Sequence, residues 1–129
     1  TIKVGTPPEL YTIKGRIDRV DTLPDGTIEI IDYKTGTPKE SLTAQDKEQL
    51  LYYQIASQEV FGEKPSKLTY YYLDDGTNQS FIGTDEDIEK LKNRAAEMIA
   101  RIRKSDFAPK PGWHCKFCDF REICEFRKM

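Results

Sequence analysis

Short apolar runs bounded by turn-forming residues recur along the chain and indicate strands. Four strands are predicted from them, over residues 10–20, 27–34, 67–73 and 78–83. Two longer stretches place apolar residues three or four positions apart, which predicts helices over residues 44–61 and 84–104. The order strand, strand, helix, strand, strand, helix predicts an α/β domain with a mixed central sheet flanked by helices.

Glycine, proline and capping residues set the predicted boundaries of these elements. The turn Leu23-Pro24-Asp25-Gly26 would join the first two strands as a hairpin, and Gly62 would end the first helix. Thr84 is a predicted N-cap, because acidic residues follow it and suit the positive end of a helix dipole. Pro7-Pro8 predicts an irregular start to the chain.

Length and composition indicate one small domain. The chain has 129 residues, of which 37% are hydrophobic and 33% charged, so it can bury a core although its composition is polar. We expect a core over residues 1–107 and a cysteine-bearing tail over residues 108–129 that packs on the same domain. No apolar run reaches the roughly 18–20 residues of a membrane span, and no signal-peptide pattern is present, which favours a cytoplasmic protein.

Charge is distributed unevenly, although the net charge is only −2. Residues 1–87 hold 9 Lys/Arg and 16 Asp/Glu, a net of −7, whereas residues 88–129 hold 11 and 6, a net of +5. An acidic half suits a bound cation, and a basic half suits phosphates. A polar helix surface followed by a basic tail explains the same numbers, so charge alone does not decide between them.

The second predicted strand ends on Asp32-Tyr33-Lys34, directly after the apolar pair Ile30-Ile31. Residues two apart in a strand point to the same face, so Asp32 and Lys34 are expected side by side. An Asp and a Lys placed in this way usually form a weak, solvated ion pair. Charges at the end of a buried strand, however, need a compensating partner or a function.

A second carboxylate, Asp18, closes the preceding predicted strand. Two carboxylates and a lysine on one hairpin form a candidate site for a divalent metal with a cationic helper. Gln49 and Tyr53 lie four residues apart in the first predicted helix and therefore share one of its faces. Taken alone, these two would be a surface glutamine and a core tyrosine.

Three short motifs follow one another in this part of the chain: Gly15-Arg16-Ile17-Asp18-Arg19-Val20, then Ile30-Ile31-Asp32-Tyr33-Lys34-Thr35-Gly36, then Gln49-Leu50-Leu51-Tyr52-Tyr53. Their order and spacing resemble the PD-(D/E)xK nuclease superfamily, and more narrowly the RecB-type exonucleases. Each motif alone is weak evidence, but three in this order over residues 15–53 are specific. The resemblance implies a restriction-endonuclease-like core and metal-dependent hydrolysis of DNA phosphodiester bonds.

The resemblance also implies roles for individual residues. Asp18 and Asp32 would ligate Mg²⁺ or Mn²⁺, with the carbonyl of Tyr33 as a further ligand. Lys34 would position the attacking water and stabilise the charge that develops on the phosphate. A lysine beside two carboxylates is favoured in its charged form, which supports an electrostatic role over that of a general base.

The same resemblance places Gln49 and Tyr53 near the active site, in contact with the strand of Lys34 or with the DNA backbone. Relatives also carry an upstream helix with a histidine or an acid that completes the metal site, whereas the only histidine here is His114. The resemblance therefore implies a chain that lacks its N-terminal part. In isolation such a chain is expected to bind metal weakly and to cleave DNA slowly.

All three cysteines lie in the tail, as Cys115, Cys118 and Cys124. An odd number in a cytosolic protein argues against a disulfide framework, and closely spaced thiolates suit a soft metal. The run resembles the cysteine triplet of iron–sulfur nucleases in the same group, which implies a [4Fe–4S] cluster whose fourth cysteine, normally far upstream, is absent here. Zinc held by the three cysteines and His114, or three free thiols, are the alternatives.

The implied function is that of a DNA exonuclease in recombination or double-strand-break repair. It would be either a standalone nuclease or the C-terminal part of a helicase–nuclease, with a helicase domain or subunit as partner. Two rival functions stay open. The first is a non-catalytic DNA-binding or scaffold module that keeps the nuclease shape, and the second is a zinc-knuckle interaction domain in which the Asp32 and Lys34 hairpin is only structural.

Overall fold

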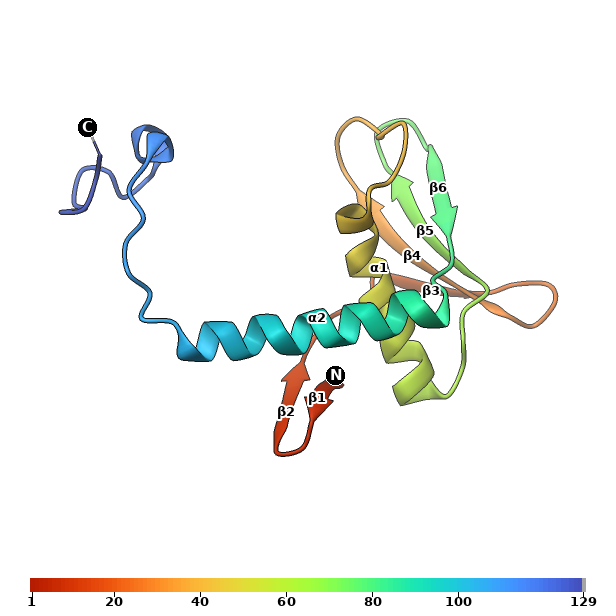
Figure 1. Ribbon diagram of the computed structural model, residues 1–129. Helices are drawn as coiled ribbons and strands as arrows, with labels where there is room; N and C mark the ends of the chain where they lie inside the picture. The colour runs from red at the N-terminus through yellow and green to blue at the C-terminus, as the bar shows by residue number, and fades with distance from the viewer. Residues whose placement is uncertain (129) are drawn as a thin grey trace. The chain divides into compact units, whose positions relative to one another are not determined.

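The computed structural model describes residues 1–128, which form two compact units, Thr1–Ile99 and the segment that begins at Ala100. Figure 1 labels the strands and helices along the chain. The strands of the first unit are β1 (Ile2–Thr6), β2 (Glu9–Ile13), β3 (Arg19–Thr22), β4 (Ile28–Lys34), β5 (Lys67–Tyr72) and β6 (Asn78–Phe81). Helix α1 covers Ala44–Ala56 and continues as a π-helical turn over Ser57–Phe61, and helix α2 covers Asp85–Lys104.

The larger sheet is mixed and has the strand order β3-β4-β5-β6. Strands β4 and β5 run parallel, whereas the β3–β4 and β5–β6 pairs are antiparallel. A parallel pair needs a long crossover connection, and α1 lies within it (Figure 1). Parallel strands end at the same edge of a sheet, so Lys34 at the end of β4 lies opposite Tyr72 at the end of β5. The predicted mixed sheet flanked by helices is thereby confirmed.

The core lies between this sheet and α1. Ile30 of β4, Leu68 of β5 and Leu50 of α1 are fully buried, and α1 contacts both strands. Helix α2 adds a further buried row, formed by Ile88, Leu91 and Ala95. An ion pair of 2.7 Å between Lys92 and Glu59 joins this helix to the turn that follows α1. The core of the first unit therefore combines buried side chains of the sheet with buried side chains of both helices.

A buried glutamine connects α1 to the segment that leads into α2. Gln54 is fully buried, and its amide both donates to the carbonyl of Gly83 and accepts from the Gly83 N–H, each at 3.0 Å. A Cβ at Gly83 would overlap Leu51 and lie 2.8 Å from Gln54 Oε1. Any other residue here would therefore force the side chains of Leu51 and Gln54 to move.

Most predicted elements are present near their predicted positions. The helix predicted over residues 44–61 is α1 with its π-helical turn, and Gly62 ends it in the left-handed conformation with φ of 70°. Thr84 caps α2 as predicted, because its hydroxyl accepts from Asp87 N at 3.1 Å while Asp87 accepts from Thr84 N at 2.9 Å.

The strand predicted over residues 10–20 is wrong as a single element. Its first part is β2, which pairs with β1 in a separate two-stranded sheet, and its last part is β3, which pairs with β4. Pro7-Pro8 forms the turn between β1 and β2 rather than an irregular start. Residues 14–18 are therefore a connection between two sheets, and Asp18 lies in it instead of at a strand end.

The second unit contains the end of α2 and a 3-10 turn over Trp113–Phe117, followed by further turns up to residue 126. Its large apolar side chains are exposed within the unit, among them Trp113, Phe117 and Ile123. Over residues 1–128, no helix is long and apolar enough to cross a bilayer.

Candidate active site

The site is built around the end of β4, where Asp32 is 2% exposed and Lys34 is half-buried. Lys34 Nζ lies 2.8 Å from Asp32 Oδ2, so the two side chains share a face of the sheet as predicted. They also lie on the face on which α1 packs, since both contact Gln49 of that helix. The pair is therefore not the solvated surface ion pair that an isolated Asp-x-Lys would form.

Gln49 of α1 joins this pair through both ends of its amide. Its Oε1 accepts from Lys34 Nζ at 2.7 Å, and its Nε2 donates to Asp32 Oδ1 at 3.1 Å. The same Nε2 lies 3.0 Å from the hydroxyl of Tyr53, one helical turn further along. Gln49 and Tyr53 thus lie on one helix face at the strand end, and the amide orientation is set by three neighbours.

Lys34 lies over the ring of Tyr70, a residue that the sequence motifs did not identify. Lys34 Nζ lies 5.2 Å from the centre of the Tyr70 ring, and the Tyr70 hydroxyl donates to the backbone carbonyl of Asp46 in α1. Burial, followed by the charge of Asp32, raises the pKa of Tyr70 to about 12, so the phenol stays neutral. The parallel register of β4 and β5 creates this contact, and the run Tyr70-Tyr71-Tyr72 alone does not identify which ring takes part.

Asp18 reaches the same strand from the connection between β2 and β3. Its Oδ2 accepts the backbone N–H of Tyr33 at 3.1 Å, and its side chain is exposed. The pKa of Asp32 is raised chiefly by burial; Lys34 lowers it, and the neighbouring Asp18 carboxylate raises it further. The structure therefore brings both predicted carboxylates together, although Asp18 arrives there by a different route from the one predicted.

The two carboxylates fit a hard divalent cation. Asp32 Oδ2 is buried and lies 2.8 Å from Lys34 Nζ, but no donor in residues 1–128 is aligned with it for a hydrogen bond. This oxygen forms an ion pair with Lys34, and no other group within residues 1–128 bonds to it. Residues 1–128 gather no group of three or more His, Cys, Asp or Glu side chains. Mg²⁺ commonly takes only one or two carboxylates, with water and substrate phosphate as its other ligands, so a pair of carboxylates is compatible with such an ion.

The three cysteines do not converge within the described part of the second unit, with or without His114. Each thiol is partly exposed. Cys115 Sγ accepts the Gly112 N–H at 3.4 Å, and the backbone N–H groups of Lys128 and Gly112 lower the pKa of the Cys115 thiol. The predicted iron–sulfur cluster and the zinc alternative therefore stay predictions.

The family model of the PD-(D/E)XK nuclease superfamily matches residues 2–125. The chain belongs to the PD-(D/E)XK nuclease superfamily. The mixed sheet, with its carboxylates and lysine at the end of β4, agrees with this assignment and with the predicted restriction-endonuclease-like core. The RecB-type subgroup and the missing N-terminal part stay predictions.

Among solved structures, the crystal structure of SSO0001 is similar to this PD-(D/E)XK chain, with a TM-score of 0.50 and 23% sequence identity. The match covers 99% of this chain and 58% of the other, so this chain spans little more than half of SSO0001. A likeness at this level of identity shows the fold alone. No curated protein matches the chain significantly.

The pKa of Asp32 predicts how pH affects stability in a chelator, where no metal is bound. Because its pKa is raised on folding, the folded state binds the proton more tightly than the unfolded chain. The free energy of unfolding should therefore fall as pH rises through the interval between the two pKa values. We expect Asp32→Asn to remove this fall and to be more stable than the wild type at pH 7, measured by urea unfolding from pH 3 to pH 8.

Glu40→Gln is the matched control for that measurement, because the Glu40 side chain is exposed. It should follow the wild-type pH profile. A less stable Asp32→Asn at pH 7 would show that the ion pair with Lys34 outweighs the burial of the carboxylate.

Proposed function

We propose that the chain is the catalytic domain of a metal-dependent DNA nuclease, an exonuclease of RecB type that hydrolyses phosphodiester bonds. One observation carries this proposal: the buried carboxylate of Asp32, whose pKa is raised by burial, lies beside a second carboxylate and contacts a lysine that Gln49 also holds. Membership of the nuclease superfamily and the likeness of the fold support it.

Asp18 and Asp32 would hold Mg²⁺ or Mn²⁺, with the Tyr33 carbonyl as a further ligand. The ion, when bound, supplies a water of lowered pKa and neutralises charge on the phosphate. The exposed Asp18 and the buried Asp32 would serve different purposes, because burial fixes Asp32 in place while Asp18 can adjust to the incoming ion. The hydrogen bond from Tyr33 N to Asp18 keeps that carboxylate at the strand end.

Lys34 would stabilise the negative charge that builds up on the scissile phosphate. Its ammonium is held by Asp32, by the Gln49 carbonyl and by the face of the Tyr70 ring, so little reorganisation is needed during the reaction. Gln49 would position Lys34, while Tyr53 fixes the amide of Gln49. These contacts favour an orienting and electrostatic lysine over a general base.

The wider role we propose is DNA recombination or double-strand-break repair, in a cytoplasmic protein that works with a helicase domain or subunit. In the longer protein the three cysteines would bind a [4Fe–4S] cluster of structural function, with a fourth ligand from outside this chain. The two N–H groups directed at Cys115 favour a thiolate, which is the form that binds metal. A non-catalytic DNA-binding module and a zinc-knuckle domain are the competing outcomes of the tests below.

Metal binding can be tested without activity. At a Mn²⁺ concentration of about 100 times the dissociation constant, we expect the free energy of unfolding to rise by about 2.7 kcal/mol. Asp18→Asn should reduce this rise strongly, whereas Asp21→Asn should not, because Asp21 is engaged by Arg19 at 2.6 Å. Equal stabilisation of both variants would place the ion elsewhere.

Cleavage tests the role of Lys34. In a Mn²⁺-dependent assay on labelled DNA, Lys34→Met should lower kcat by roughly 10²- to 10³-fold, because it removes the positive charge and keeps an alkyl chain over Tyr70. Lys67→Met is the control, since Lys67 begins β5, far along the strand from Tyr72, and pairs with Glu29 at 3.6 Å. Unchanged cleavage by Lys34→Met would rule out this role, and metal binding without any cleavage would favour the non-catalytic module.

The metal bound by the three cysteines can be identified from the iron, zinc and sulfide content of the purified protein. Anaerobically purified full-length protein is expected to contain iron and acid-labile sulfide, with a broad visible absorbance that Cys118→Ser abolishes. Zinc in place of iron would favour the zinc-knuckle domain, and neither metal would leave three free thiols.

A further inference from the structure

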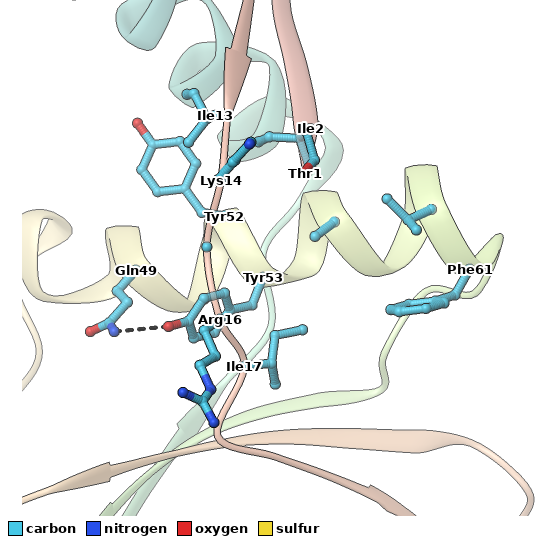
Figure 2. A pocket seen from close by; sticks show the side chains of 13 residues that line it. Thr1, Ile2, Ile13, Lys14, Arg16, Ile17, Gln49, Tyr52, Tyr53 and Phe61 are labelled. Carbon is cyan, nitrogen blue, oxygen red and sulfur yellow. Dashed lines mark hydrogen bonds between the residues drawn. The ribbon is translucent and has the colours of Figure 1, made fainter.

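A second feature of the first unit lies directly beside the candidate active site. It is a groove of about 520 Å³ between residues 13–17, which include most of the connection between the two sheets, and the C-terminal half of α1 with its π-helical turn. Figure 2 shows this segment crossing α1, with Gln49 towards one end of the helix and Phe61 at the other. The volume falls within the range of sites that bind a small organic molecule.

The groove and the active site share two residues. Gln49, which accepts from Lys34, and Tyr53, which accepts from Gln49, also line the groove (Figure 2). Gln49 lines in addition a second, polar groove of about 540 Å³ that contains Lys34 and Lys39. A polymer whose scissile bond lies at Lys34 would therefore have both grooves within reach, because Gln49 lines each of them.

The lining of the first groove combines apolar surface with unpaired positive charge. Ile2, Ile13 and Phe61 supply apolar surface, while Lys14 and Arg16 are its charged residues and no acidic residue lines it. The side chains of Lys14 and Arg16 make no hydrogen bond or ion pair within residues 1–128. An occupant that complements this surface has a flat apolar part and an anionic part.

The aromatic ring of Phe61 is available to such an occupant. It is 69% exposed, and its neighbour Val60 is 54% exposed. Both belong to the π-helical turn that extends α1, and the left-handed Gly62 ends that turn directly after Phe61. An exposed aromatic ring at the end of a helix offers a face on which a base can stack.

We infer that this groove binds one unstacked nucleotide of the DNA substrate next to the scissile phosphate, with its base on Phe61 and its phosphates near Lys14 and Arg16. The inference rests on the proposed function for the identity of the polymer. In a duplex the bases are stacked and paired, so that filling the groove would require extruding one. A single-stranded or frayed end offers an unstacked base at no such cost, and the groove therefore selects such ends.

The test uses a labelled single-stranded oligonucleotide and a series in which one abasic position is moved along it. Base–aromatic stacking is typically worth about 1–3 kcal/mol, so an abasic site at the position that fills the groove should lower cleavage in Mn²⁺ about tenfold or more. Phe61→Ala should lower cleavage of the intact oligonucleotide by a similar factor. In this variant the cleavage rate should no longer depend on where the abasic site lies. Phe61→Trp should restore the preference for a base.

Leu10→Ala is the matched control. Leu10 is 44% exposed in β2 and does not line the groove. Its replacement should leave both the cleavage rate and the dependence on the abasic position unchanged. The double variant Lys14→Ala, Arg16→Ala should weaken binding at low salt and reduce the salt dependence of log K by about 1.4 for a single strand.

Binding of the same oligonucleotides in EDTA, followed by fluorescence anisotropy, separates this inference from the proposed function. Base-dependent binding that Phe61→Ala abolishes supports the nucleotide site even if no cleavage occurs, in which case only the nuclease proposal fails. Metal-dependent cleavage with the same abasic profile in the wild type and in Phe61→Ala overturns the nucleotide site alone. A polypeptide segment would then be the alternative occupant of the groove.

Discussion

The burial of a single carboxylate, Asp32, constrains most of the first unit. A charged group at the end of a buried strand is costly unless opposite charge and hydrogen bonds compensate it. Here the compensation comes from Lys34 on the same strand and from Gln49 on α1. Because α1 must present its glutamine at this point, the position of the helix along the sheet is coupled to the site. Tyr70 strengthens the coupling, since it contacts Lys34 and also bonds to the backbone of α1.

The compensation is incomplete, and this has chemical meaning. One oxygen of Asp32 contacts only the Lys34 ammonium. The pKa of Asp32 is raised by burial, and the carboxylate of Asp18 lies close by. A polypeptide gains no stability from two neighbouring carboxylates, whereas a divalent cation satisfies both at once. The arrangement therefore supports the proposal that Asp18 and Asp32 hold an ion. Carboxylates whose pKa is raised in this way are common at functional sites.

Part of this site could be predicted from the sequence because its spacing is local. The period of a strand places Asp32 beside Lys34, and the period of a helix places Gln49 beside Tyr53. The limits of the helices were also predictable, since Thr84 and Gly62 carry their own capping chemistry. The division of residues 10–20 between two sheets was not, because a strand's partner depends on residues far away in the chain.

The sequence by itself determined the types of side chain at the site, their local pairing and the resemblance to a nuclease family. Only the tertiary structure decided that Asp18 approaches from a connection and that Tyr70 lies beneath Lys34. It also decided that Lys14 and Arg16 flank an apolar groove shared with Gln49. The physical reason is that periodicity acts over a few residues, whereas a parallel register and a crossing between a connection and a helix arise only when the core packs.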